Sequence, residues 1–499
     1  MNCTNTQILR TIIFILAFSN LSCSQPPQET NQKPNIVFIL ADDMGYGDPQ
    51  CYNPDSKIPT PNIDQLAAEG MMFRDAHSAG AWCVPSRYGL MTGQYPGRIE
   101  LNWRDRSLLQ PTQETLATLM KRNGYKTACV GKWHLGFDNI NWEDAEKNDI
   151  LTGGPVERGF DYFFGMHASL DIPPYFCIEN DRLVEKATGF TDDNASEDAT
   201  SEISGAFWRK GACSPNFKHK EVLDVFFKKA ENFVASHVKN DAGKPFFLYF
   251  PFTAPHTPWL PKDEFVNKSG AGEYGDFTMQ VDQLLGQIRA MLKEKGVADN
   301  TLIVFTTDNG PVWFEEDIEK FNHDSKGGLK GMKIDLWEGG SRIPFIVSWP
   351  GHIPEGTESN QLIGFTDMMA TFASIVGDKS FNQSGFDSYD FTPVWFKEGY
   401  DIPIRNELVM QDKSYRKDNY KLILGSGLGG LSQRYDNKGT YLSEADNKGE
   451  LYDLSTDPTE SNNLYNQQPE RVKQMKAEFD KIMAVKYATA NDDVIPAEN

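Results

Sequence analysis

Four apolar runs in the chain each end in side chains that are able to bind a metal ion or to transfer a proton. These side chains are Asp42 and Asp43 after 35–40, Lys132 and His134 after 127–130, His256 after 245–250, and Asp308 and Asn309 after 301–305. Such near-continuous apolar runs are typical of buried parallel strands. Open α/β sheets bind their ligands beyond the carboxyl ends of the strands. We therefore expect these side chains to meet at one edge of a sheet.

The oxygen-bearing side chains in this group predict a site for a hard divalent cation. By itself, an adjacent pair such as Asp42-Asp43 is more often a solvated turn or a helix cap. A second pair after another strand, Asp308-Asn309, favours a metal site, because carboxylate and amide oxygens are the ligands that calcium and magnesium prefer. A zinc site would need more nitrogen or sulfur.

The histidines and the lysine add acid–base and electrostatic chemistry. Taken singly, His134 and His256 are expected to be structural, each bonded to a backbone carbonyl. Their positions at strand ends instead favour a role in ester hydrolysis, which needs a donor for the leaving oxygen and a base. Lys132 would present a fixed positive charge to an anionic group in transfer.

Composition and charge limit the class of protein. The 499 residues are 39% hydrophobic and 24% charged, which is ordinary for a globular protein with a large core. The 49 Lys and Arg residues against 70 Asp and Glu give a net charge of -21, which disfavours nucleic acid and anionic lipid as partners. A cleft can still gather enough cations to bind an anionic substrate.

The N-terminus predicts export. Arg10 precedes the apolar run 11–18, which is too short to span a membrane and is typical of a signal peptide ending near Cys23. Cys23 lies where a lipoprotein signal places its lipidated cysteine, so both a lipid anchor and simple secretion stay open. A polar linker follows at 24–33. We expect a periplasmic or envelope-anchored protein, or a secreted one, with no other membrane attachment.

Five of the seven cysteines lie in the expected mature chain. An odd number in an oxidising compartment leaves at least one thiol unpaired or chemically altered, and Cys83 is the candidate. Cys177 and Cys213 could form a disulfide, which their spacing does not decide.

The remaining pattern predicts an α/β fold. Besides the four runs above, 345–348 is expected to be a fifth buried parallel strand. One helix is expected to open at Pro61 and to end at Gly70, and a longer one carries 281–292 and closes at Gly296. Alternation of such strands and helices predicts a central sheet flanked by helices.

The segment Cys83-Val-Pro-Ser-Arg87, followed by Tyr88-Gly-Leu-Met-Thr-Gly93, resembles the C-x-P-S-R signature of the formylglycine-dependent sulfatases, members of the alkaline phosphatase superfamily. In that family the cysteine is oxidised to an aldehyde before folding. The other stretches that resemble the family are 131–136, 159–165, 331–344 with Lys333, and 451–464. The resemblance thus covers nearly the whole mature chain.

The resemblance implies a role for each candidate residue. It implies one calcium ion held by Asp42, Asp43, Asp308, Asn309 and the hydrated aldehyde of residue 83. Arg87 would orient the hydrate, and Lys132, His256 and Lys333 would bind the sulfate. His134 would take a proton so that the sulfated intermediate breaks down, and His256 would protonate the leaving alcohol. A hydrated aldehyde suits this reaction because its second hydroxyl expels the sulfate without a second attack on sulfur.

The resemblance also implies the domain layout. A large alkaline-phosphatase-like catalytic domain with a mostly parallel sheet is expected at 34–377, and a smaller C-terminal α+β subdomain at 378–499. Strands at 420–424 and 450–452 would form its short antiparallel sheet, and 470–485 would be its closing helix. A maturation enzyme, either formylglycine-generating or anaerobic, is implied as a partner.

Sulfate-ester hydrolysis is the function that these observations favour. The alternatives are a phosphatase or phosphodiesterase of the same superfamily and a non-catalytic glycan-binding protein. We expect a sulfated polysaccharide or its oligosaccharides as substrate, with algal material such as ulvan or carrageenan favoured over glycosaminoglycan. Specificity would come from the loops 101–106, 167–182 and 191–204, with Trp103 and Arg104 on a sugar-binding rim.

Overall fold

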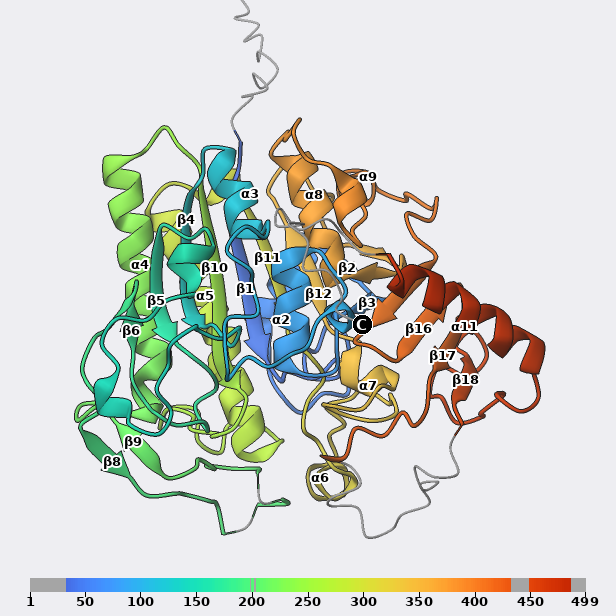
Figure 1. Cartoon of the computed structure of the whole chain (residues 1–499), viewed down its shortest axis with the longest axis horizontal. Coiled ribbons are helices and arrows are strands. Elements are labelled where there is room, and N and C mark those ends of the chain that lie inside the picture. Colours follow the sequence, from blue (N-terminus) through green and yellow to red (C-terminus); the bar gives the residue numbers. More distant parts are fainter. Residues whose placement is uncertain (1–32, 198, 202, 432–447, 486–499) are drawn as a thin grey trace, which may run out of the picture. The chain divides into compact units, whose positions relative to one another are not determined.

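The structure is a computed structural model that describes residues 33–197, 199–201, 203–431 and 448–485 (Figure 1). The expected signal peptide at 1–23 and all of the expected linker except Lys33 lie outside these residues. From Lys33 onward the chain is one compact unit, so the boundary expected between 377 and 378 stays a prediction. Within the described residues, no helix has the length and apolar character needed to span a membrane.

A ten-stranded mixed sheet forms the centre of this unit. Its strands in spatial order are β13 (Thr357–Ser359), β2 (Met71–Phe73), β12 (Phe345–Ser348), β11 (Thr301–Thr307), β1 (Asn35–Asp42), β10 (Phe246–Pro255), β4 (Lys126–Lys132), β5 (Tyr162–Met166), β6 (Ile178–Glu179) and β7 (Arg182–Leu183). The five strands β11, β1, β10, β4 and β5 are mutually parallel. The expected central, mostly parallel sheet is thereby confirmed.

One strand runs against the expectation. The segment 345–348 is a buried strand, β12, but it pairs antiparallel with β11. An apolar run reports burial on both faces of a sheet, and it carries no information about strand direction.

Helices cover both faces of the sheet, as Figure 1 shows. On one face, alternate β1 residues such as Phe38 pack with α2 (Cys83–Thr92), α3 (Leu116–Arg122), α8 (Met368–Ile375) and α9 (Thr392–Trp395). On the other face, the intervening residues such as Ile39 pack with α1 (Pro61–Ala68), α4 (Val222–Asn240) and α5 (Gly272–Glu294). Every residue of β1 is buried, as its apolar sequence predicts.

A second sheet follows near the C-terminus. Its four antiparallel strands are β15 (Glu407–Met410), β16 (Ser414–Lys417), β17 (Tyr420–Ile423) and β18 (Glu450–Asp453). The helix α11 (Pro469–Met483) packs Val472, Met475 and Phe479 against this sheet, as its apolar spacing predicts. The small antiparallel sheet and its helix confirm the expected C-terminal α+β part of the fold.

Short elements complete the loops. Two small strand pairs are β3 (Ala76–His77) with β14 (Ile363–Gly364), and β8 (Gly189–Thr191) with β9 (Gly211–Cys213). The helices α6 (Glu315–Phe321) and α7 (Glu338–Ser341) lie in the long connection between β11 and β12. All five described cysteines are unpaired, so the disulfide left open for Cys177 and Cys213 is not formed.

Candidate active site

The register of the three central strands brings their carboxyl ends together. Ala41 of β1 lies opposite Thr307 of β11, and Asp42 lies opposite Pro255 of β10. The next residues along these strands are therefore neighbours in space. Asp43 has a left-handed backbone, with φ 64°, and its amide donates to Asp308 Oδ1 at 3.2 Å. This conformation is costly for a residue other than glycine and persists only where the surrounding structure holds it.

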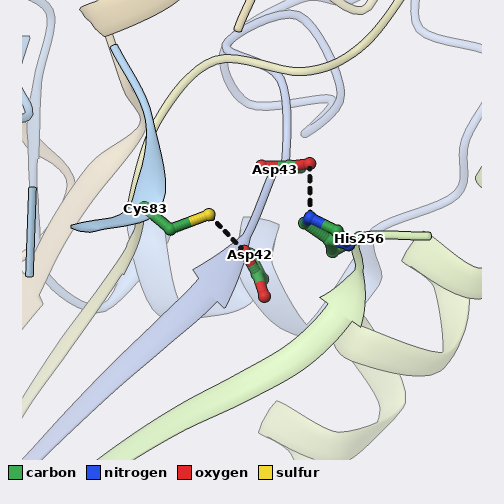
Figure 2. A group of neighbouring side chains, drawn as sticks. All are labelled: Asp42, Asp43, Cys83 and His256. Carbon is green, nitrogen blue, oxygen red and sulfur yellow. Dashed lines mark hydrogen bonds and ion pairs between the residues drawn. The ribbon is translucent and has the colours of Figure 1, made fainter. Parts of the chain in front are cut away.

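Cys83 lies at the first position of α2 and points at the end of β1 (Figure 2). Its Sγ is 3.6 Å from Asp42 Oδ1 and 3.2 Å from Lys132 Nζ. Burial raises the pKa of the thiol, although Lys132 and Lys333 oppose this effect. The unmodified thiol is thus a weak nucleophile at neutral pH, because only the thiolate reacts readily.

Three buried cations match three buried carboxylates around Cys83. Lys132 Nζ lies 2.6 Å from Asp42 Oδ2, and Lys333 Nζ lies 2.7 Å from Asp43 Oδ2. Arg87 donates through Nε and Nη2 to Asp308 Oδ2, at 3.0 and 2.7 Å. Such close pairing is what allows six charged groups to be buried together.

The electrostatics keep this cluster ionised. Burial raises the pKa of Asp42, but Lys132, His256 and Arg87 together hold it below its ordinary value. Burial likewise raises the pKa of Asp43, but Lys333 and His256 hold it below its ordinary value. Burial lowers the pKa of Lys333, yet the neighbouring acids, Asp43 first, raise it above the ordinary value. The lysine is therefore an ammonium ion at neutral pH.

The donor set fits a hard divalent cation. One ligand atom from each of Asp42, Asp43, Cys83 and His256 lies within 4.8 Å of the others, and Figure 2 shows these four side chains converging. Asn309 donates through Nδ2 to Asp43 Oδ1 at 2.7 Å, while its buried Oδ1 has no hydrogen-bond partner among the described residues. Carboxylates and an amide oxygen left free in the interior are the ligands that calcium accepts.

The loop that carries Lys333 is held by the rest of the chain. The Lys333 amide donates to Pro311 O at 2.8 Å, and the Ile334 amide donates to Ala81 O at 2.6 Å. Farther along, Trp337 Nε1 donates to Glu450 Oε2 of β18 at 2.6 Å. The C-terminal sheet thus helps to position Lys333, which belongs to the site at the end of the ten-stranded sheet.

The two histidines have different surroundings. His134 is buried and has a left-handed backbone, and neither ring nitrogen has a hydrogen-bond partner among the described residues. Burial, then the charges of Lys132 and Arg87, hold its pKa well below the ordinary value, so it is neutral. His256 Nδ1 lies 2.6 Å from Thr257 O, and its Nε2 lies 3.6 Å from Asp43 Oδ2. Since a carbonyl only accepts, Nδ1 carries a proton and Nε2 faces the site.

The two residues expected on a sugar rim are placed differently from each other. Trp103 is buried, and its ring lies edge-on to His134 with 4.4 Å between the ring centroids. Arg104 is exposed and lies over Trp103 and Trp142, 5.0 and 5.3 Å from their ring centroids. Only Arg104 is therefore at the surface, while Trp103 packs behind a candidate catalytic residue.

A cavity of about 210 Å³ adjoins the cluster and contains residues that the sequence did not single out. It is lined by Asp43, His256 and Lys333 from the cluster, and by Asp171, Ile203, Arg209, Pro255, Thr257, Trp259, Tyr274, Val312, Ile334 and Leu431. Asp171 and Ile203 fall in the loops expected to set specificity. No spacing signal marked these residues individually, because most of them come from loops far apart in sequence. Pro255 is the last residue of β10, and Tyr274 lies in α5.

The arrangement suits transfer of an anionic group. Buried cations can offset the charge of the group, and a neutral histidine can accept a proton beside them. Comparison with known proteins identifies the anionic group that is transferred. Residues 34–377 match the Sulfatase family, and residues 333–486 match the family described as N-sulphoglucosamine sulphohydrolase, C-terminal.

The chain belongs to the sulfatase family. It is a sulfuric ester hydrolase, and the resemblance seen in the sequence to formylglycine-dependent sulfatases of the alkaline phosphatase superfamily is confirmed. The sulfatase is 32% identical over 496 residues to an N-acetylgalactosamine-6-O-sulfatase from Bacteroides thetaiotaomicron, covering 91% of this chain and 94% of the relative. It is 31% identical over 470 residues to human arylsulfatase A, covering 91% and 86% of the two chains.

Solved structures agree with this assignment. The sulfatase superposes with a TM-score of 0.76 and 29% identity on a Bacteroides thetaiotaomicron sulfatase solved in a study of glycosaminoglycan metabolism, covering 91% of this chain and all of the other. A sulfatase from a Pseudoalteromonas species superposes with a TM-score of 0.67 at 25% identity, covering 92% of each chain.

Proposed function

We propose that this sulfatase removes sulfate from a sulfated carbohydrate outside the cytoplasm, with formylglycine made from Cys83 and one calcium ion. The observation that carries the proposal is the buried cluster of Asp42, Asp43, Asp308 and Asn309 beside Cys83, in a chain of the sulfatase family. The expected signal peptide at 1–23 supports export, by simple secretion or with a lipid anchor at Cys23.

Calcium, when bound, would polarise the sulfate, and the hydrate of formylglycine would supply the attacking oxygen. The chain's own side chains prepare the site for this chemistry. Lys132 and Lys333 place two ammonium groups next to residue 83, where they offset the negative charge that repels a nucleophile. Arg87 holds the Asp308 carboxylate through two nitrogens and so fixes its orientation.

The histidines supply the proton transfers. Because Nδ1 of His256 donates to the Thr257 carbonyl, donation from Nε2 requires a second proton on that atom. In this imidazolium form, His256 can give its Nε2 proton to the leaving alcohol oxygen and return to the neutral ring with a proton on Nδ1. His134 is neutral and buried beside the cations, so it can accept a proton during regeneration of residue 83. Trp103 packs on the His134 ring and limits its motion.

The substrate class rests on the relatives. Curated relatives act, by their names, on N-acetylgalactosamine 6-sulfate, and this favours a glycan that bears a 6-sulfated hexosamine or hexose. The preference for algal polysaccharide stated from the sequence stays a prediction. Both classes therefore belong in one test.

Sulfate release from a panel of defined oligosaccharides tests the proposal. The panel contains chondroitin-type, heparin-type, carrageenan, ulvan and fucoidan fragments, with 4-nitrophenyl sulfate and 4-nitrophenyl phosphate as simple esters. We expect sulfate release from the nitrophenyl ester and from at least one glycan, and far slower phosphate release. Hydrolysis of 4-nitrophenyl sulfate but of no glycan sulfate would contradict the proposal, and so would hydrolysis of 4-nitrophenyl phosphate only.

A further inference from the structure

The loop after β5 contains buried polar atoms without a hydrogen-bond partner in the part of the chain that the structure describes. His167 Nδ1, Ser169 Oγ and Asp171 Oδ1 all lack a hydrogen-bond partner among the described residues, within a stretch of chain that follows the carboxyl end of a parallel strand. Buried polar atoms are nearly always bonded, so these three exceptions within 167–171 need a cause. A polar ligand is such a cause where one of these atoms lines a cavity.

Of these three residues, Asp171 lines the cavity beside the candidate catalytic residues. Its side chain is 9% exposed, and Oδ1 lies 4.0 Å from His256 Nδ1. Because Nδ1 already donates to Thr257 O at 2.6 Å, His256 does not satisfy this oxygen. An ionised carboxylate can only accept hydrogen bonds, so the missing partner is a donor.

A cation holds Asp171 in place from the opposite side. Arg209 Nη1 donates to Asp171 Oδ2 and also to the Asp171 backbone carbonyl at 3.2 Å. Arg209 also lines the cavity, and its side chain is half-exposed. The pair therefore offers one buried acceptor and the remaining guanidinium donors in the lining of one cavity.

The other walls suit a sugar ring. Ile203, Pro255, Trp259, Val312 and Leu431 line the cavity with apolar surface, against which the C–H face of a pyranose can pack. The volume of about 210 Å³ is below the roughly 300 to 1,000 Å³ of drug-sized pockets, so it accepts one ring.

We propose that Asp171 and Arg209 recognise a free hydroxyl on the sulfated ring itself, which makes Asp171 a specificity-determining residue for a neutral hexose or hexosamine. This inference rests on the proposed function, since Lys333 and His256 of the same cavity must hold the sulfate end. A ring with a second sulfate on the recognised hydroxyl is rejected, because that sulfate has no hydrogen to donate and meets the Asp171 carboxylate.

Deoxygenated substrates test the proposal on the unaltered enzyme. The parent substrate is the fastest of the 6-sulfates of N-acetylgalactosamine, galactose and glucosamine, and analogues lacking the hydroxyl at C3 or at C4 are compared with it. A hydrogen bond to a charged group implies a loss of roughly 10- to 100-fold in kcat/KM for one analogue. Equal rates for all three compounds, or no turnover of any of the 6-sulfates by an enzyme that hydrolyses 4-nitrophenyl sulfate, would overturn it.

The Asp171→Asn variant then tests whether Asp171 makes the contact with this hydroxyl. We expect this variant to lower the ratio of kcat/KM for the sugar sulfate to that for 4-nitrophenyl sulfate by about tenfold or more. We also expect it to lose most of the difference in kcat/KM between the parent and the deoxygenated substrates. Arg209→Gln, at a half-exposed position, serves if the first variant does not fold, and the same pattern is expected. Asp263→Asn is the control, because Asp263 is exposed, pairs with Lys220 and does not line the cavity.

The possible results distinguish failure of this inference from failure of the proposed function. Equal losses of kcat/KM on both substrates in Asp171→Asn would mean that the carboxylate acts through His256. An unchanged difference between the parent and the deoxygenated substrates would mean that another residue binds the hydroxyl. Either result overturns the inference and leaves the proposed function intact. Absence of turnover of every sulfate ester by the matured wild-type enzyme would overturn both.

Discussion

Removal of the Lys333 side chain is expected to slow the hydrolysis of every sulfate ester by a similar factor. Lys333 is held 2.7 Å from Asp43, is 11% exposed at its side chain and lines the cavity with His256. A preorganised cation or donor at a reacting anion contributes about 10²- to 10³-fold to kcat. We therefore expect Lys333→Ala to reduce kcat/KM by about 10²- to 10³-fold on 4-nitrophenyl sulfate and on a sugar sulfate alike.

Loss of stability is a second consequence that the experiment must separate. Without Lys333 the buried Asp43 carboxylate loses its nearest cation, and breaking a buried pair costs up to about 3–5 kcal/mol in unfolding free energy. Thermal melting will show whether the variant is folded at the assay temperature. Lys326→Ala is the matched control, because Lys326 is 7% exposed at its side chain in the same connection and pairs with the exposed Glu315 outside the cavity.

Folded Lys333→Ala that keeps its kcat/KM within about fivefold of the wild type would show that Lys333 does not stabilise the reacting sulfate. A rate that falls on the sugar sulfate alone would show the same, since a cation that binds the sulfate must act on the group common to both substrates.

Three further predictions concern the metal, the rim and the pH dependence. Chelation should abolish hydrolysis of 4-nitrophenyl sulfate, and calcium should restore it better than zinc, because the ligands are oxygens; equal rescue would argue against calcium. Arg104→Ala should reduce kcat/KM for the glycan more than for the nitrophenyl ester, because the exposed Arg104 can contact only a larger substrate; equal losses would place Arg104 in the sulfate site. Burial, then the charge of Arg104, lowers the pKa of His167 to about 4 from 6.5, so protonation favours the unfolded chain. The contribution of neutral His167 to the free energy of unfolding is complete above pH 6.5 and falls by about 3 kcal/mol as the pH drops to about 4. His167→Gln should therefore weaken the pH dependence of the melting temperature over this range. An unchanged pH dependence would contradict the lowered pKa of His167.

The sequence predicted the central sheet and much of the site for the same physical reason. Parallel strands place their carboxyl ends at one edge, so the residues at and just after the ends of β1, β10 and β11 had to meet there, and Asp42, His256 and Asp308 do. Arg87 and Lys333 follow no strand, and only the family resemblance pointed to them. Their positions depend on α2 and on a loop fixed by contacts with the C-terminal sheet.

Other features could not be predicted because they depend on tertiary contacts. The direction of β12 depends on its connection to β11, which an apolar run does not encode. Trp103 was expected on an open rim, but its ring is buried against His134, since an aromatic residue in a loop packs wherever apolar surface is available. Asp171 and Arg209 come from loops whose path the local pattern does not determine.

The chemical state of residue 83 in active enzyme decides whether formylglycine made from Cys83 is the nucleophile. The measurement is the mass of the tryptic peptide that contains residue 83, taken on preparations whose sulfate-releasing activity is known. We predict a form about 18 Da lighter than the cysteine peptide, with specific activity proportional to its fraction, because an aldehyde replaces the thiol. Full activity in a preparation that contains only the unmodified Cys83 peptide would show that the enzyme does not use formylglycine.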